Sequence, residues 1–142
     1  MTLDRNGPEI LSRSECMTLL ESVTIGRVGV SIAALPVILP VNFAVVDGDI
    51  IIRTPAATKL GEAAINVVVA FEADGFDPVW HRGWSVLVQG VAEQVTDPAA
   101  LERLRCLHLS PWGDVEGHFV RIGTQILSGH RLDAVGAGHV CL

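Results

Sequence analysis

Residues 35–60 read LPVILPVNFAVVDGDIIIRTPAATKL, and this stretch sets the fold that the rest of the chain must extend. Two apolar arms rich in β-branched residues flank the dipeptide Asp47-Gly48. Both residues of that dipeptide tolerate a positive φ, so the pattern predicts a tight hairpin turn between antiparallel strands. The second arm ends in polar residues that a buried hairpin does not need, namely Arg53, Thr54, Thr58 and Lys59.

Further strands are predicted on both sides of this hairpin. Residues 26–32 (GRVGVSI) alternate and precede the hairpin arms at 37–46 and 49–54, so the three segments predict an antiparallel meander. Residues 66–72 (NVVVAFE) lack alternation, which indicates a strand covered on both faces. The remaining predicted strands are residues 83–94, 118–122 and 126–131.

Short helices interrupt the strands. The sequence Ser12-Arg13-Ser14-Glu15 has the form of a capping box, which predicts a helix that runs to about Ser22. Asp97-Pro98 provides an N-cap and a first helical residue for another helix. Gly90 stands within the long strand, where a bulge or bend would curve the sheet. Six or so strands with a few short helices and no β-α-β alternation predict a mainly β fold, a small antiparallel barrel.

Composition limits the size and the partners of the protein. The 142 residues are expected to form a single domain, residues 1–142, with a core from about 11 to 132 and short tails at both ends. Apolar residues make up 49% and charged residues 18%, so part of the apolar surface is expected to be buried against a second copy of the chain. The formal charge of −6 provides no positive field for a phosphate backbone, so nucleic acid is not an expected partner.

A cytoplasmic protein without a metal site is expected. The three cysteines are scattered, and neither they nor the histidines have ligand-like spacing. Residues 28–46 carry no charge and approach the length of a membrane span. Pro36 and Pro40 would break the backbone hydrogen bonds that a lone helix in lipid needs, so we do not expect a membrane helix. The N-terminus lacks the pattern of a secretion signal.

The polar end of the hairpin allows two interpretations. Thr54-Pro55 can begin a short helix around residues 57–64, or Thr58 can cap a helix that starts at Lys59. In either register, backbone amides, a hydroxyl group and two cations converge at a helix N-terminus, which suits a phosphate. In the alternative interpretation, Arg53 and Lys59 are solvated surface charges and Thr54 is only a cap.

Two motifs together resemble a known family. Residues 53–60 (RTPAATKL), followed by residues 83–93 (GWSVLVQGVAE), are similar to the pyridoxamine 5′-phosphate oxidase-like family of flavin-binding split barrels. The similarity extends from about residue 11 to residue 131. It implies a split antiparallel β-barrel of the FMN-binding type. It also implies that the FMN phosphate is held by Arg53, Thr54, Thr58 and Lys59.

The resemblance also assigns residues to the isoalloxazine ring. It places the ring against Val41, Asn42 and Phe43, where the Asn42 amide could pair with the polar edge of the ring. Ser85 stands at a ring-contacting position of the long strand, and Trp112 is the candidate to cover the ring from a partner subunit. The oxidase itself carries an Arg and a Lys where this chain has the uncharged residues 40–43. Vitamin B6 oxidation is therefore not expected.

The function implied by the resemblance is that of an FMN-binding protein. We expect a homodimer with cofactor sites at its interface, acting as a flavin-dependent oxidoreductase on an unknown small-molecule substrate. The flavin would carry the chemistry, so no catalytic residue is named. Two alternatives stay open: a reductase of the same fold that uses the deazaflavin F420, and a non-catalytic protein that binds flavin or haem.

Overall fold

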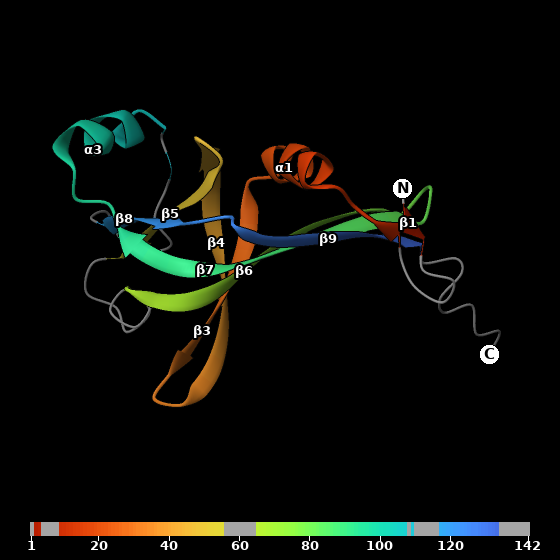
Figure 1. Cartoon of the computed structure of the whole chain (residues 1–142), viewed down its shortest axis with the longest axis horizontal. Coiled ribbons are helices and arrows are strands. Elements are labelled where there is room, and N and C mark those ends of the chain that lie inside the picture. The colour runs from red at the N-terminus through yellow and green to blue at the C-terminus, as the bar shows by residue number, and fades with distance from the viewer. Residues whose placement is uncertain (1, 4–8, 56–64, 108, 110–116, 134–142) are drawn as a thin grey trace.

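The computed structural model describes residues 2–3, 9–55, 65–107, 109 and 117–133 of the chain (Figure 1). Strands dominate this part, and the helices that it contains are short. In chain order the elements are β1 (Thr2–Leu3), β2 (Glu9–Ile10), α1 (Arg13–Glu21), β3 (Ile25–Ile32), β4 (Leu35–Val46), β5 (Asp49–Pro55), β6 (Val67–Asp77), β7 (Arg82–Gln94), α3 (Pro98–Arg105), β8 (Gly117–Ile122) and β9 (Ile126–Asp133).

Six of the strands close a barrel. They follow the order β6-β3-β4-β5-β8-β7, and β7 pairs again with β6. Outside the barrel, β9 pairs with the first half of β7, and the short strands β2 and β1 follow at the edge of the sheet. Because β7 belongs both to the barrel and to this outer sheet, the fold is the split antiparallel barrel that the sequence predicted.

The predicted meander is confirmed in β3, β4 and β5. Asp47 and Gly48 have φ angles of 51° and 79°, as the two central residues of a type I′ turn require. β5 continues through Pro55, however, where a helix start at Thr54-Pro55 was one of the two predictions. That interpretation is wrong, because this end of β5 pairs with β8, a strand far along the chain.

β7 changes its partner at Gly90, the position of the predicted bend. Its residues from Arg82 to Gln89 pair with β9, and those from Ala92 to Gln94 pair with β8. A Cβ atom at Gly90 would lie 2.6 Å from the carbonyl oxygen of Gly123 in the turn between β8 and β9. A residue without a side chain is therefore needed for the strand to pass from one sheet into the other.

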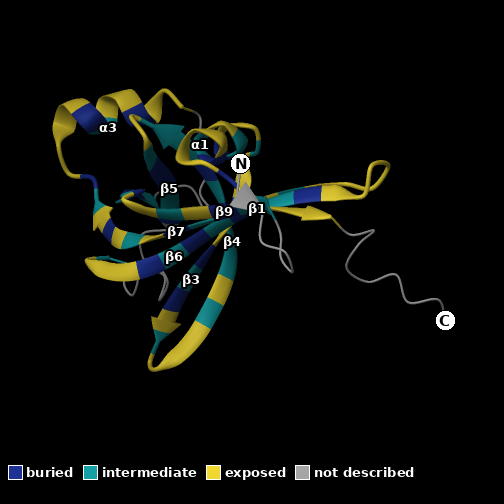
Figure 2. Cartoon of the chain, turned by 45° about the vertical axis from the view of Figure 1, so that its right-hand side comes forward, coloured by how far each residue is buried: buried dark blue, intermediate teal, exposed yellow. Residues whose placement is uncertain are grey.

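The hydrophobic core fills the barrel and continues beneath α1. All six barrel strands contribute inward-facing residues to it, and Figure 2 shows buried segments where the strands cross and exposed segments at the hairpin tips. A second, smaller cluster lies outside the barrel wall, where α3 covers Ile51 of β5 and Phe119 of β8. The outer face of β5 is thus covered by a helix near the end of the strand.

α1 begins at the predicted capping box, and hydrogen bonds link it to the β8–β9 turn and, through that turn, to the β4–β5 turn. The Ser12 hydroxyl accepts a hydrogen bond from the Glu15 amide, and the Glu15 carboxylate accepts one from the Ser12 amide, both at 3.1 Å. Arg13 donates to the carbonyl oxygen (2.7 Å) and the hydroxyl (2.9 Å) of Thr124. The Thr124 hydroxyl donates in turn to the carbonyl oxygen of Gly48 at 2.6 Å. The helix, the β4–β5 turn and the β8–β9 turn are therefore linked.

α3 begins at its predicted N-cap, since the Asp97 carboxylate accepts a hydrogen bond from the Ala100 amide at 3.0 Å. The apolar stripe of the helix places Ala100 and Leu104 in the cluster against the barrel wall. Across the described part of the chain, no helix has both the length and the apolar character that a membrane crossing requires.

Candidate functional site

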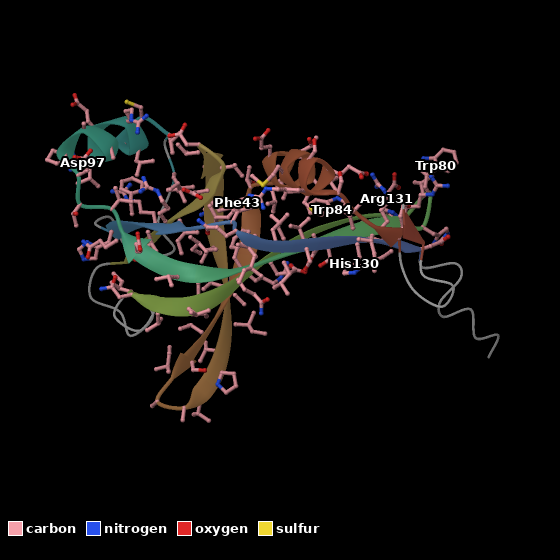
Figure 3. The ribbon with its side chains drawn as sticks, in the orientation of Figure 1. Phe43, Trp80, Trp84, Asp97, His130 and Arg131 are labelled. Atoms are coloured by element: carbon pink, nitrogen blue, oxygen red, sulfur yellow. The ribbon has the colours of Figure 1, made fainter. Side chains whose placement is uncertain are left out.

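The β4–β5 hairpin has two chemically different faces. Val41 and Phe43 point into the barrel, where they are 2% and 3% exposed. Since side chains alternate along a strand, Asn42 lies on the outer face. Of the three residues predicted to meet a flavin ring, only Asn42 therefore presents its side chain outside the barrel, and Val41 and Phe43 could meet a ligand there only through their backbone. Figure 3 shows Phe43 among the side chains inside the fold.

Asn42 and Arg53 both lie on that outer face, at the end of the β4–β5 ladder. The last pair of the β4–β5 ladder at this end joins Phe43 to Ile52, and both of these residues face the core. Asn42 and Arg53 each stand one residue beyond this pair, so side-chain alternation turns both of them outward. Two of the predicted cofactor-binding residues thus lie on the same face of the hairpin, the face outside the barrel.

The guanidinium group of Arg53 is only partly satisfied within the described chain. It lies over the Phe119 ring, 5.1 Å from its centroid, and Nη1 donates to the Leu109 carbonyl oxygen at 3.4 Å. Its Nε is buried and has no hydrogen-bond partner among the described residues. A buried N–H group without a partner costs free energy, and an anion beside it would supply the missing acceptor.

A cavity of about 430 Å³ opens beside Arg53, between the ends of β5, β7 and β8 and the helix α3. Arg105 from α3 lines it, together with His118 and Gln94, whose side chains are hydrogen-bonded to each other at 2.8 Å. Phe119 lies among its apolar lining residues. None of the described residues that line this cavity is acidic, so it has the charge that a phosphate group needs.

Thr54 does not share this environment. Its side chain is 1% exposed and faces the barrel interior, with its hydroxyl 3.5 Å from the carbonyl oxygen of His118. The hydroxyl is therefore on the opposite face of β5 from the Arg53 guanidinium. Thr58, Lys59 and Trp112, the other predicted cofactor-binding residues, lie outside the described residues.

Ser85 belongs to a separate polar group on the outer face of the sheet. Its hydroxyl donates to the Glu72 carboxylate at 3.2 Å. Arg27 Nη1 donates both to Glu72, at 3.1 Å, and to Asp74, at 2.9 Å. Partial burial, followed by the hydrogen bond and the charge of Asp74, raises the pKa of the Glu72 carboxyl, while Ser85 and Arg27 oppose that shift. Ser85 is thus hydrogen-bonded within the chain, and two strands, β6 and β3, lie between its strand and that of Asn42.

The residues around Arg53 that sequence reasoning missed come from remote segments. Phe119 is opposite Arg53 in the β5–β8 ladder, and His118 is opposite Thr54. Arg105 and Gln94 approach the same cavity from α3 and β7. No local motif joins these positions, so only the closure of the barrel reveals them. Within the described chain, no group of three or more His, Cys, Asp or Glu side chains is arranged to hold a metal ion.

Comparisons with known proteins agree with this architecture. A family model described as pyridoxamine 5′-phosphate oxidase matches residues 12–131. The uncharacterized protein Rv0080 of Mycobacterium tuberculosis is 45% identical over 130 residues, which cover 87% of this chain and 85% of that protein. The family model therefore spans all six barrel strands and most of the outer strand β9.

Solved structures with sequence similarity share the fold. The FAD binding protein from Mycobacterium smegmatis is 40% identical, with a TM-score of 0.76 over 87% of this chain and 98% of that chain. A conserved protein of unknown function from Corynebacterium diphtheriae is 35% identical, with a TM-score of 0.71 over 87% of this chain and 96% of that chain. By its sequence and its split barrel, this chain belongs to the pyridoxamine 5′-phosphate oxidase family.

Proposed function

We propose that this protein binds a flavin nucleotide on the outer face of the β4–β5 hairpin. The observation that carries the proposal is the Arg53 guanidinium, whose buried Nε has no hydrogen-bond partner among the described residues. It lies beside a cavity whose described lining contains no acidic residue. A phosphate group would satisfy that nitrogen and neutralise the charge. The flavin-binding relative from Mycobacterium smegmatis, at 40% identity, supports the choice of ligand.

Different residues of the hairpin would bind different parts of the cofactor. Asn42 would hydrogen-bond the polar edge of the ring, and Arg53 would hold the phosphate, with Thr58 and Lys59 as further phosphate ligands by their match to the family motif. A bound flavin supplies hydride transfer, and the chain would orient the ring and exclude water from it. On this basis the protein is a flavin-dependent oxidoreductase that acts on a small molecule.

A second copy of the chain would complete the site. The outer face of β3, β4 and β6 exposes large apolar side chains, including Ile25 (53% exposed), Ile38 (73%) and Val68 (69%). The sequence of β6 predicted a strand covered on both faces, yet within one chain only its inner face is covered. A homodimer that packs through this face would bury these residues and enclose Asn42 between the subunits.

The dimer is tested by sedimentation. Val68→Asp should convert the dimer to a monomer at micromolar concentration and weaken cofactor binding, because a charge would enter the interface. Val79→Asp is the matched control, since Val79 is 77% exposed at the tip of the β6–β7 hairpin, away from the packing face. A wild-type protein that sediments only as a monomer and still binds flavin would exclude this arrangement.

The cofactor is tested by the absorbance spectrum of the purified protein, and by titration with FMN, FAD, F420 and riboflavin. We expect a flavin spectrum, and nucleotides that bind at least about tenfold more tightly than riboflavin, which has the same ring without a phosphate. A single deazaflavin band would favour F420 instead. A protein that takes up none of these ligands would refute the proposal. A bound flavin that NAD(P)H cannot reduce, and that no acceptor reoxidises, would favour a carrier role over an enzyme.

A further inference from the structure

The helix α3 packs against the two groups that contact the Arg53 guanidinium. The first is the Phe119 ring, which lies opposite Arg53 in the β5–β8 ladder, with its centroid 5.1 Å from the guanidinium carbon. The second is the carbonyl oxygen of Leu109, which accepts a hydrogen bond from Nη1 of Arg53 at 3.4 Å. The side chains of Phe119 and Leu109 both belong to the small apolar cluster that α3 covers outside the barrel wall.

α3 confines the Phe119 ring from the side away from the barrel. The ring is buried, and Ala100 and Leu104 of the helix are buried in the same cluster. Since protein interiors are closely packed, a ring held in this way cannot shift unless its neighbours shift as well. The position of the helix therefore determines where the aromatic face meets the cation.

This confinement matters because an arginine side chain has many rotamers. An anion that binds a freely rotating guanidinium must first order it, and the lost conformational entropy weakens binding. A guanidinium that already lies over an aromatic ring and donates to a carbonyl group has lost much of that freedom beforehand. The buried Nε of Arg53, without a partner among the described residues, is then presented to an incoming acceptor.

The attachment of α3 to the barrel wall is small. Of its eight described residues, only Ala100 and Leu104 are buried. Its ion pair, between Arg103 and Asp47 at 3.8 Å, joins side chains that are 70% and 77% exposed, so it contributes little to stability. Elements with few buried apolar contacts open at a low free-energy cost. Docking of the helix can therefore respond to what the guanidinium binds.

We infer that docking of α3 regulates anion binding at Arg53. The docked helix holds Phe119 and Leu109 against the guanidinium, and a bound phosphate in turn favours the docked helix, because coupling between two equilibria is reciprocal. This inference rests on the proposed function, since it concerns the phosphate end of the same site. Phe119 is a positioning residue, which acts on the anion only through Arg53.

The first test compares affinities for FMN and riboflavin, measured by quenching of flavin fluorescence. Phe119→Leu keeps an apolar side chain under α3 but lacks the aromatic face. It should weaken FMN binding by about fivefold or more and change riboflavin binding by less than about twofold. Phe71→Leu is the matched control, because it removes a buried ring from the main core, and it should change neither affinity by more than about twofold. Equal losses for the two ligands in Phe119→Leu, or no loss for either, would overturn the positioning role.

The second test needs no flavin and follows hydrogen exchange of the backbone amides in α3. In protein freed of any flavin, inorganic phosphate should slow this exchange by about threefold or more, relative to sodium chloride at the same ionic strength. Amides of α1 serve as the internal control and should not respond. Arg53→Ala should abolish the protection of α3.

The exchange experiment separates the failure of this inference from the failure of the proposed function. Protection of α3 that depends on Arg53 would support the coupling even if no flavin bound. Exchange in α3 that phosphate leaves unchanged, or slows equally in wild type and Arg53→Ala, would overturn the coupling even if FMN bound tightly.

Discussion

Two arginines on the outer surface of the barrel wall have opposite surroundings. Arg27 on β3 donates to both Glu72 and Asp74, so its charge is more than balanced by neighbouring strands. Arg53 on β5 has an aromatic ring and a backbone carbonyl group beside it, and among the described residues no carboxylate pairs with it. The first guanidinium is satisfied by the chain itself, and the second is not.

This difference indicates which of the two guanidinium groups is the better candidate to bind a ligand. A partly buried charge without a counter-charge costs free energy, and a chain normally balances such a group from its own residues, as it does at Arg27. Among the described residues that balance is missing at Arg53, which lies next to a cavity, so an external anion would offset the cost. The same reasoning assigns Arg27 and its carboxylates to the stability of the sheet.

The largest predicted effect contrasts the two arginines in ligand binding. Arg53→Ala should weaken FMN or FAD binding by about 10- to 100-fold, because each charge-assisted contact contributes roughly 1.5 to 3 kcal/mol. Arg27→Ala should change the same affinity by less than about twofold. Fluorescence titration measures both. If the two substitutions weakened binding equally, the contrast between the two sites would be wrong.

The next effect concerns two glycines beside these arginines. A Cβ atom at Gly117 would collide with the carbonyl oxygen of Thr54, whereas one at Gly29 would lie 3.6 Å from Ala70. Gly117→Ala should therefore lower the free energy of unfolding by about 1 to 3 kcal/mol, as overpacked sites do. Gly29→Ala should leave it unchanged or raise it by up to about 0.5 kcal/mol. Urea denaturation of both variants tests this, and similar losses in the two would refute the close approach of β8 to β5.

A smaller effect on stability is expected when the ion pairs between Arg27 and its neighbouring carboxylates are lost. Arg27→Ala should lower the free energy of unfolding by roughly 0.2 to 1 kcal/mol, the range of partly exposed ion pairs, because its side chain is 47% exposed. High salt should reduce the difference between wild type and variant, since salt screens the pair. A difference that is independent of salt would mean that Arg27 acts through packing alone.

The smallest effect is a pH dependence at Glu72. Its pKa in the folded protein is raised above the ordinary 4.5, so the ionised carboxylate costs stability in the fold. The stability that the protonated carboxyl contributes is complete below about 4.5 and is lost as the pH rises through the higher, folded pKa. Glu72→Gln should therefore be more stable than wild type at neutral pH, with the advantage vanishing toward acid.

Urea denaturation of the two proteins across this pH range measures the Glu72 effect. Carbon NMR of the Glu72 carboxyl gives a second reading, because Asp74→Asn should lower the pKa of Glu72 by removing the neighbouring charge. An advantage for Glu72→Gln that grows toward acid pH would contradict the sign of the shift.

The sequence predicts local features of this molecule well, because each depends on adjacent residues. The Asp47-Gly48 turn requires two residues that tolerate positive φ, and the caps at Ser12 and Asp97 need only a side chain near free amides. Gly90 signalled a bend through its missing side chain, and β7 changes partner there. The family resemblance adds the split barrel as a whole.

The environment of the candidate site could not be predicted in the same way. Arg53 and Asn42 are visible as polar residues at the end of apolar arms, yet the partner of Arg53 in the ladder, Phe119, is set by the pairing of β5 with β8. That pairing also extends β5 through Pro55 and turns Thr54 inward, which a local capping pattern cannot reveal. Long-range strand pairing therefore accounts for most of what was missed.

The β5–β8 seam also affects how the chain is made. Ile50 of β5 pairs with Ile122 of β8, so the barrel cannot close until β8 has emerged from the ribosome. Until then β5 is an apolar edge strand with unpaired amides and carbonyls, a template for association with other chains. Synthesis rate and chaperone supply should consequently govern the yield of this protein. Truncation before Gly117 would leave that edge permanently exposed, and such a fragment should aggregate rather than fold.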